Sequence, residues 1–528
     1  MAANGALACL LLTNLYWTSC LAFESFAQAK WPNHGGGIEN LREARPGGNL
    51  SPSTVANLKT KWRVKTTGDV TATPAIANGM VYFPTWDGEL FAVKEKDGSI
   101  LWRKNLTEVV GGSKTIITSR ATPVVENKYL LVGFYGPALL IALHIQTGKL
   151  LWSTFLDANP YAVITMSGTV YESEYYVGIS SISEAVVDEP CCTFQGSMVK
   201  VDIKTGKIKW RTKMVPDNGN KIGLYSGAAI WGSSPPIDCK RRMIYIATGN
   251  LYSTPPDVTE CEAKQENKTV RDIPDPCISP DDHSESILAL NLDSGRVVWA
   301  HQLGGYDTWV VSCFNTNGPQ PNCPPIVGPD YDFAEAPMML TIPHPDKHGR
   351  SWLDVVIAGQ KSGVVWALER DNGTLVWDTV SGPGSAVGGS MWGMTTDGER
   401  VFTNVVNYYE DNFTLLPSNV VINTGGWVAM NASSGEVLWS VANPDLSLPF
   451  GPLSSANGVV FAPGMGAPNG TMYALDPVSG GVLWRQKVGG WLQGGASISD
   501  GCIYFGEGLH AANVSSATPS AVNAICLP

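Results

Sequence analysis

Apolar and polar positions alternate along most of the chain in short runs, the pattern of β-strands that bury one face. Seven pairs of these runs share one formula: an alternating strand, a turn, and a second strand that ends in tryptophan. A glycine stands four residues before each tryptophan, where the turn requires a residue that tolerates positive φ. FAVKEKDGSILW and YALDPVSGGVLW are the first and last examples. The seven tryptophans are Trp102, Trp152, Trp210, Trp299, Trp377, Trp439 and Trp484.

Two further strand-like runs precede each pair, such as ATPAIAN and MVYFPTW before the first. Four strands per repeat are typical of a propeller blade. A final set after Trp484 lacks its tryptophan strand, and ANLKTKW, which ends at Trp62, supplies it. The sequence therefore predicts an all-β chain with one eight-bladed β-propeller over residues 31–528, closed by the N-terminal strand. The tryptophans are expected to be wedges between blades.

Long insertions between the predicted strands are confined to one kind of connection. With the strands of a blade named A to D, the B–C and D–A connections open on the same face of the disc. The insertions fall at 182–195, 250–285, 303–335 and 408–425, all in these connections. Long loops on a rigid scaffold usually carry function, so we expect the site over the central channel on this face.

The start of the chain predicts a secretory signal over residues 1–29. No charged residue precedes Glu24, and a short apolar core at 7–15 is followed by Ala-Gln-Ala. The basic region usual in such signals is missing, so an uncleaved anchor stays open. No second apolar run approaches spanning length, and the mature chain is expected to be secreted, extracellular or vacuolar. Eight glycosylation sequons begin at Asn49, Asn105, Asn267, Asn372, Asn412, Asn431, Asn469 and Asn513.

Nine of the 11 cysteines lie beyond the signal, so at least one thiol is expected to be unpaired or intermolecular. Cys191 and Cys192 are adjacent in DEPCCTFQG. They form either a vicinal ring or two disulfides to distant cysteines, Cys239 among them, and the sequence leaves both open. The other candidate pairs are Cys261 with Cys277, Cys313 with Cys323, and Cys502 with Cys526.

A net charge of −11 without any basic run argues against nucleic acid or an anionic membrane surface as a partner. The chemistry is therefore expected to concern a small molecule or a protein.

Several longer motifs resemble those of a known protein family. The opening LSPSTVANLKTKW, together with the repeats, resembles the quinoprotein alcohol dehydrogenases. PCCTFQGSMVKVDIKTGKIKW, IWGSSPPIDCKRRMIYIATGN and VIAGQKSGVVWALERDNG look most like the polyvinyl-alcohol-dehydrogenase-like branch. The resemblance covers nearly the whole mature chain. It implies pyrroloquinoline quinone lying over the channel beside a calcium ion, with hydride transfer from an alcohol.

The resemblance also implies roles for single residues. Glu184 in GISSISE falls on the calcium carboxylate and Asn250 in IATGN on the calcium amide. Lys361 in AGQKSG falls on the cation that contacts the quinone oxygens. Trp231 in AIWGSS falls on the floor beneath the quinone, and Trp392 in SMWGM holds the matching place two blades later. Each of these residues also has a purely structural interpretation. Glu184 fits a solvated loop acid, Asn250 fits a turn residue, and Lys361 fits an exposed turn residue.

Two departures stand out. The family's catalytic aspartate follows a tryptophan, but Val310 follows Trp309 in GYDTWVVS. Asp307, two residues before that tryptophan, is the substitute we predict as general base. The family's adjacent cysteines also lie in a different blade, so Cys191 and Cys192 are expected to form the rim of the cofactor pocket.

No C-x-x-C-H motif occurs, so covalent haem is excluded and electrons must pass to a separate acceptor. Two other functions stay open. The propeller could serve a different small-molecule transformation without the quinone, or it could bind a protein or glycan without catalysis.

Overall fold

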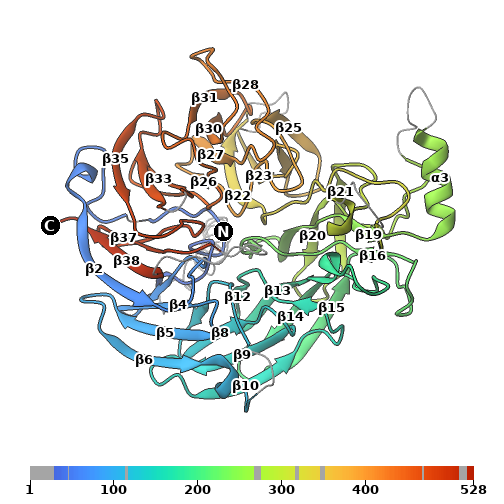
Figure 1. The fold of residues 1–528 in the computed structure, drawn as a ribbon, viewed down its shortest axis with the longest axis horizontal. Helices are drawn as coiled ribbons and strands as arrows, with labels where there is room; N and C mark the ends of the chain where they lie inside the picture. The colour runs from blue at the N-terminus through green and yellow to red at the C-terminus, as the bar shows by residue number, and fades with distance from the viewer. Residues whose placement is uncertain are drawn as a thin grey trace, which may run out of the picture.

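The computed structural model describes residues 29–45, 47–112, 117–266, 275–314, 320–344, 351–466, 469–509 and 520–528. Within these residues, eight four-stranded antiparallel blades surround one axis, as Figure 1 shows. The predicted eight-bladed propeller is confirmed. The predicted signal lies outside the described residues except for its last position.

The blades follow one another in chain order, each with its A strand innermost. Blade one is β3 (Ala75–Ala77), β4 (Met80–Pro84), β5 (Glu89–Lys94) and β6 (Ile100–Asn105). Blade two is β7 (Val124–Glu126), β8 (Tyr129–Gly133), β9 (Leu139–His144) and β10 (Leu150–Phe155). Blade three is β12 (Thr169–Tyr171), β13 (Glu174–Ser181), β14 (Ser197–Asp202) and β15 (Ile208–Lys213), with β11 (Ala162–Val163) on the end of β13. Blade four is β17 (Ile237–Asp238), β18 (Met243–Ala247), β20 (Ser286–Asn291) and β21 (Val297–Gln302).

The second half continues the pattern. Blade five is β22 (Met338–Pro343), β23 (Trp352–Gly359), β24 (Val364–Glu369) and β25 (Leu375–Val380). Blade six is β26 (Thr395–Thr396), β27 (Arg400–Val405), β30 (Gly426–Asn431) and β31 (Val437–Ala442). Blade seven is β32 (Ser454–Ala456), β33 (Val459–Gly464), β34 (Thr471–Leu475) and β35 (Val482–Lys487).

Blade eight joins the two ends of the chain. Its inner strands are β36 (Ser497–Ser499), β37 (Cys502–Gly506) and β38 (Ser520–Cys526), and its outer strand is β2 (Lys59–Thr66). The β2–β38 register runs from Lys59 opposite Cys526 to Thr66 opposite Ser520. In Figure 1 the blue β2 therefore lies beside the red β38. The predicted closure by the strand that contains Trp62 is confirmed.

The tryptophan and glycine of the repeat form one contact between neighbouring blades. Trp62 donates from Nε1 to the carbonyl of Glu95, and Trp102 does the same to Ile145. Five more pairs repeat this bond at 2.9–3.1 Å, from Trp152, Trp210, Trp299, Trp377 and Trp439. The ring packs on the next blade's turn, where a Cβ on Gly98 would lie 2.8 Å from the Trp62 ring. The repeated glycine therefore leaves room for the tryptophan as well as supplying positive φ, and the predicted wedge role is confirmed for these tryptophans.

The N-terminal residues 29–45, called the strap below, run through the centre of the ring. β1 (Ala29–Trp31) pairs with β3, the innermost strand of blade one. The following residues then hydrogen-bond around the axis to Val125 of blade two, Ser167 before blade three, Ile237 of blade four, Met339 of blade five, Thr395 of blade six, Ser455 of blade seven and Ala496 before β36 of blade eight. The strap thus contacts all eight blades.

The remaining elements belong to the long connections or to short turns. The connections span 182–196, 248–285, 303–337 and 406–425, within two residues of the predicted insertions. They hold η2 (Ser183–Ala185), β19 (Leu251–Ser253), α3 (Pro256–Glu266), η3 (Val311–Phe314), β28 (Phe413–Thr414) and β29 (Val421–Ile422). Elsewhere lie η1 (Val55–Asn57), α2 (Leu106–Val109) and β16 (Ser226–Gly227), which pairs with β19. In the described residues, no helix is both long and apolar enough to cross a membrane.

The disulfides settle most of the predicted pairings. Cys191 bonds to its neighbour Cys192, so the vicinal ring forms. The three other candidate pairs, Cys261–Cys277, Cys313–Cys323 and Cys502–Cys526, are confirmed. Cys239 is also disulfide-bonded, so none of the described cysteines is the unpaired thiol that the odd count predicts.

The sequons differ in exposure. Asn49, Asn372 and Asn412 are exposed, while Asn105, Asn431 and Asn469 are partly buried. Asn267 and Asn513 lie outside the described residues.

Candidate functional site

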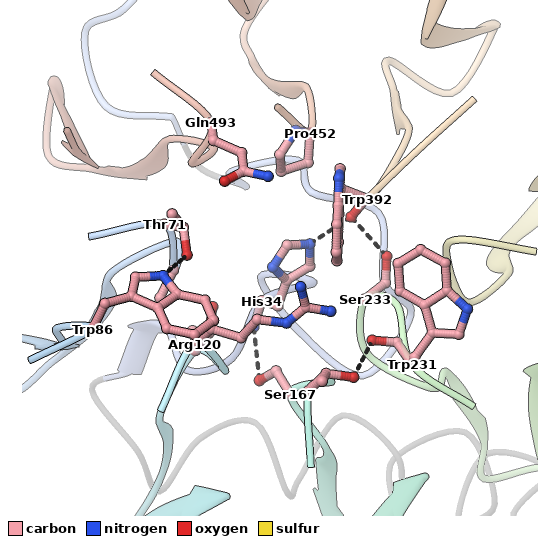
Figure 2. Close-up of a pocket in the computed structure, with 13 residues that line it drawn as sticks. His34, Thr71, Trp86, Arg120, Ser167, Trp231, Ser233, Trp392, Pro452 and Gln493 are labelled. Carbon is pink, nitrogen blue, oxygen red and sulfur yellow. Dashed lines mark hydrogen bonds between the residues drawn. The ribbon is translucent and has the colours of Figure 1, made fainter. Parts of the chain in front are cut away.

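A chamber lies on the propeller axis and is built mainly by the D–A connections. Figure 2 shows His34 of the strap at its centre, with Arg120, Trp231 and Trp392 around it. Thr71, Thr122, Thr165, Pro452 and Gln493 complete the wall from other blades. Because each D–A connection ends near the axis, the fold gathers residues from positions 34 to 493 into one cavity. The chamber lies on the channel axis, over which the site is predicted.

Lys361 is the cation of the site and is buried, not exposed as a turn residue would be. It follows β23 in the short B–C turn of blade five and is 6% exposed. Its Nζ donates to Asp330 at 3.0 Å and to Asp332 at 2.8 Å. Burial alone would lower the pKa of Lys361, but the two aspartates and Glu184 outweigh burial and raise it. The lysine therefore stays charged.

Glu184 lies within reach of the same charges. It sits in η2, directly after β13, and accepts a hydrogen bond from Tyr252. Burial, followed by the negative charge of Asp332, raises the pKa of Glu184 to about 7, while Lys361 and Arg120 oppose the shift. The structure thus brings Glu184 and Lys361 into one electrostatic cluster.

Asn250 closes this cluster from blade four. Its backbone N–H donates to Asp332 Oδ1 at 2.6 Å. Its Nδ2 donates to the carbonyls of Leu251 and Trp309, so the Oδ1 oxygen is left for an outside ligand. The preceding Gly249 allows this approach, because a Cβ there would lie 2.2 Å from the Asp332 carboxylate.

The two predicted tryptophans meet at the chamber wall. Trp231 and Trp392 pack edge to face with ring centroids 5.0 Å apart. Trp231 donates from Nε1 to Asp332 Oδ2 at 3.2 Å, and Lys361 Nζ lies 5.5 Å from its ring centroid. The Arg120 guanidinium lies 4.7 Å from the Trp392 ring centroid. Trp231 therefore borders both the carboxylate cluster and the axial chamber.

Asp307, the predicted general base, binds backbone groups through both carboxylate oxygens. Its two oxygens accept the backbone N–H groups of Asp330 at 3.1 Å and Tyr331 at 2.7 Å. Burial raises the pKa of Asp307 to about 6, although these two hydrogen bonds act against the shift. Asp307 thus fixes the segment that carries Asp330 and Asp332. Val310 is buried in the apolar core.

The vicinal pair lies beside Glu184. The Cys191 sulfur is 3.0 Å from the carbonyl oxygen of Ser183, and the Cys191 N–H donates to Asn322 Oδ1. Asn322 also donates to the carbonyls of Val186 and Glu189. The connections 182–196 and 303–337 are thereby joined, and the cysteines belong to the rim where they meet.

Sequence reasoning missed Asp330, Asp332, Arg120 and Tyr252. The two aspartates stand in GPDYDFAEAP, where Asp330 is 2% exposed and Asp332 5%. Acids spaced two apart, just before a buried strand in a connection without any basic residue, are the signal that could have revealed them.

The chamber also holds hydrogen-bond donors without partners. Arg120 Nε, Thr122 Oγ1 and Trp392 Nε1 are buried, line the chamber and bond to no described residue. Buried donors that converge on a cavity fit a ligand that is anionic or rich in carbonyl oxygens.

Among the described residues, a different group brings three acidic or thiol ligand atoms within 4.8 Å of one another: Glu262, Asp275 and Cys277 near α3. The Cys277 sulfur is bonded to Cys261, so it cannot act as a thiolate ligand. Figure 1 shows α3 at the outer edge of the ring, far from the axis.

Fold and site together define an eight-bladed propeller with an oxygen-rich cluster beside an axial chamber. The family model PQQ_2, described as outer membrane protein assembly factor BamB, matches residues 54–242 and 424–516. These ranges exceed half of the chain, and the chain belongs to this family.

Individual relatives place it closer to the quinoprotein dehydrogenases. The polyvinylalcohol dehydrogenase of a Pseudomonas sp. is 28% identical over 91% of this chain and 73% of its own length. The polyvinylalcohol dehydrogenase of Sphingopyxis sp. (strain 113P3) is 28% identical over 87% and 69%. The resemblance to the polyvinyl-alcohol-dehydrogenase-like branch is confirmed.

Solved structures share the fold. The quinohemoprotein alcohol dehydrogenase from Comamonas testosteroni aligns with a TM-score of 0.68 at 17% identity, over 95% of this chain and 80% of that one. A europium-containing methanol dehydrogenase aligns with a TM-score of 0.66 at 14% identity, over 95% and 98%.

Proposed function

We propose that this chain is a quinoprotein dehydrogenase that binds pyrroloquinoline quinone with a calcium-type cation and oxidises an alcohol or a related small molecule. One observation carries the proposal: a largely buried cluster of three carboxylates and Lys361 adjoins a chamber that holds three donors without partners among the described residues. The polyvinylalcohol dehydrogenase relatives support the same class of reaction.

The chamber fits the chemistry of the quinone. Pyrroloquinoline quinone is flat and carries carboxylates, and Trp231 offers a broad aromatic face beside the chamber. The unpartnered donors on Arg120, Thr122 and Trp392 suit its carboxylates, and Lys361 suits its quinone oxygens. Cys191 and Cys192 would border the pocket on the Glu184 side.

The cluster also fits a hard cation. Glu184 and Asp332 offer carboxylate oxygens and Asn250 offers its free Oδ1, the ligand types that calcium prefers. A bound cation would stabilise the charged form of Glu184, which burial otherwise disfavours.

The remaining acid, Asp330, is suited to accept a proton. Lys361 binds its Oδ1, while its Oδ2 accepts no hydrogen bond from the described residues. When bound, pyrroloquinoline quinone supplies the acceptor for the hydride that the alcohol carbon loses. Asp330 would take the hydroxyl proton at Oδ2, and Asp307 would act as a positioning residue that holds this segment in place.

The proposal includes secretion and a separate electron acceptor. Four disulfides join described residues, as is usual for proteins of oxidising compartments. N-terminal sequencing of the protein recovered from culture medium tests the predicted cleavage near residue 29.

The test of function is a titration of the full chain with pyrroloquinoline quinone, followed by tryptophan fluorescence. It is run without metal, with calcium and with a trivalent lanthanide. We expect cation-dependent binding that Glu184→Gln abolishes. Glu189→Gln, an exposed acid on the same connection, should leave binding intact. In the loaded enzyme, Asp330→Asn should slow reduction of a small dye by an alcohol by about a hundredfold or more.

The alternatives give different results. Absence of quinone binding with every cation would contradict the proposal and leave another small-molecule enzyme or a non-catalytic binding propeller. Equal loss of binding in both glutamate variants would remove the assigned role of Glu184.

A further inference from the structure

The segment 186–192, called the cysteine loop below, joins the turn that holds Glu184 to the vicinal ring. From Val187 to Cys192, no backbone N–H donates to another backbone group among the described residues. Backbone groups in such a segment need partners from side chains or from solvent. The shape of the cysteine loop therefore depends on contacts with other parts of the molecule.

The side chain of Asn322 supplies the contacts to the backbone of this loop. Its Oδ1 accepts the N–H of Cys191 at 3.0 Å. Its Nδ2 donates to the carbonyls of Val186 and Glu189, each at 2.9 Å. Both donors and the acceptor oxygen of the amide are thus used on one loop. A single side chain holds the cysteine loop near its beginning and near its end.

Asn322 is itself fixed by its own connection. Its φ is 67°, a left-handed conformation that asparagine adopts more readily than most residues. The next residue, Cys323, is bonded to Cys313 of η3. Ser312 of η3 donates from Oγ to the carbonyl of Pro321 on the other side. The amide is therefore held in place from both of its neighbours.

The cysteine loop in turn packs on η2, the turn that holds Glu184. The two sulfurs of the vicinal ring lie 3.0 and 3.5 Å from the carbonyl oxygen of Ser183, the first residue of η2. Val186 ends the same turn, with its N–H bonded to the Ser183 carbonyl. Asn322 therefore acts on η2 from both sides, through Val186 and through the ring, and Glu184 lies between these two contacts.

We propose that Asn322 is a positioning residue for Glu184: it holds the cysteine loop against η2 and so keeps the Glu184 carboxylate in the orientation that binds the cation. This inference rests on the proposed function, in which Glu184 is a ligand of a calcium-type cation. Groups that orient a metal ligand change metal affinity about tenfold or more without touching the metal. The amide does this from 131 positions away in the chain.

The first test measures binding of terbium(III) alone to the full chain, through luminescence excited by tryptophans such as Trp231. The site is the binding phase that Glu184→Gln removes. Asn322→Ala should weaken this phase about tenfold or more, because η2 is then held from neither side. The matched control is Asn159→Ala. Asn159 is also half-buried, and its Nδ2 donates to Thr193 of the same connection, beyond the cysteine loop. This control should bind terbium like the unaltered protein.

The second test needs no metal. The vicinal disulfide is reduced with a phosphine, the freed thiols are alkylated, and the modified peptide is followed by mass spectrometry. The half-buried Cys191 should be reduced several-fold faster in Asn322→Ala, because a released loop opens more often. The rate should stay unchanged in Asn159→Ala. In the unaltered protein, hydrogen exchange should show the N–H of Cys191 protected by its bond to Asn322.

Equal weakening of terbium binding by both asparagine variants would overturn the proposal, since general damage to the connection would then explain it. Unchanged terbium binding in Asn322→Ala, or rapid exchange of the Cys191 N–H in the unaltered protein, would overturn it as well. If the unaltered protein has no terbium phase that depends on Glu184, the proposed function fails. The reduction rates would then still decide whether Asn322 holds the loop.

Discussion

Glu335 is a buried acid that lies near a countercharge of the strap, Arg42. Its Oε1 accepts the backbone N–H of Gly359 at 2.7 Å. Burial raises the pKa of Glu335 to about 8, although that hydrogen bond and the charge of Arg42 act in the opposite direction. Burial also lowers the pKa of Arg42 to about 9. The effect of burial on the two pKa values is therefore larger than the effect of the opposite charges on each other.

The raised pKa of Glu335 predicts how stability depends on pH. Between an ordinary value of 4.5 and about 8, the unfolded chain releases this proton while the folded chain keeps it. The contribution of Glu335 to the free energy of unfolding is therefore complete below pH 4.5 and is lost as the pH rises to about 8. Glu335→Gln keeps the acceptor for Gly359 and should remove this loss. In thermal unfolding, the stability of the variant relative to the unaltered protein should increase as the pH rises. The opposite trend would mean that Glu335 forms an ionised pair with Arg42.

At the scale of residues, sequence predicts a site residue where a motif resembles that of the family. Glu184, Asn250 and Lys361 stand in such motifs, each a few positions after a B strand. Asp330 and Asp332 stand in a D–A insertion of variable length, where no repeat fixes the register. Asp307 is close to them in the chain, but its orientation depends on backbone N–H groups more than 20 positions away.

The strap is the element that ties the blades to the chamber. Trp392 has a φ of 71°, unusual for a bulky residue, so neighbouring contacts must hold its backbone. Two donors converge on its carbonyl, His34 Nε2 at 2.8 Å and Ser233 Oγ at 2.9 Å. Burial, then the charge of Arg42, holds the pKa of His34 well below its usual value. A neutral imidazole that bonds a carbonyl through Nε2 must carry its proton there.

His34 should therefore act as a positioning residue for Trp392. Because the Arg120 guanidinium lies over the Trp392 ring, His34 should also position Arg120 indirectly. His34→Leu removes the donor and should lower affinity for pyrroloquinoline quinone by about 1 kcal/mol, roughly fivefold to tenfold. His34→Gln can donate from its amide and should recover part of this loss. Near-ultraviolet circular dichroism should report the changed tryptophan environment in the leucine variant even without ligand.

A control variant distinguishes the role of the His34 imidazole from that of the strap backbone. Ser167→Ala removes only the acceptor of the His34 backbone N–H, a 3.2 Å contact. If it weakens quinone binding as much as His34→Leu, the imidazole has no special role.

At the scale of elements, the strands could be predicted and the strap could not. Strands such as β2 and β15 show alternation within their own residues, which is a local signal. The path of the strap depends on single hydrogen bonds to blades spread over more than 400 residues, and no local pattern encodes such contacts. A short A strand such as β26, with two residues, depends in the same way on its neighbours.

The whole molecule is a ring, so its stability depends on how the ring is closed. Blade eight combines β2, near one end of the chain, with three strands at the other end. The last strand, β38, lies between β37 and β2 and has all seven residues buried. The sequence revealed this arrangement because each end carries an incomplete blade that the other completes.

The Cys502–Cys526 disulfide holds β38 to β37 at this junction, across a separation of 24 residues. Its removal should lower the free energy of unfolding of the whole ring by about 3 kcal/mol, because the unfolded chain regains the entropy of an open loop. Cys261–Cys277, with a separation of 16, closes the α3 excursion outside the ring. Replacing each pair by alanine and following unfolding in denaturant should therefore lower the global midpoint for the first pair only. An equal decrease for both would mean that the α3 excursion unfolds together with the ring and that closure at blade eight has no special weight.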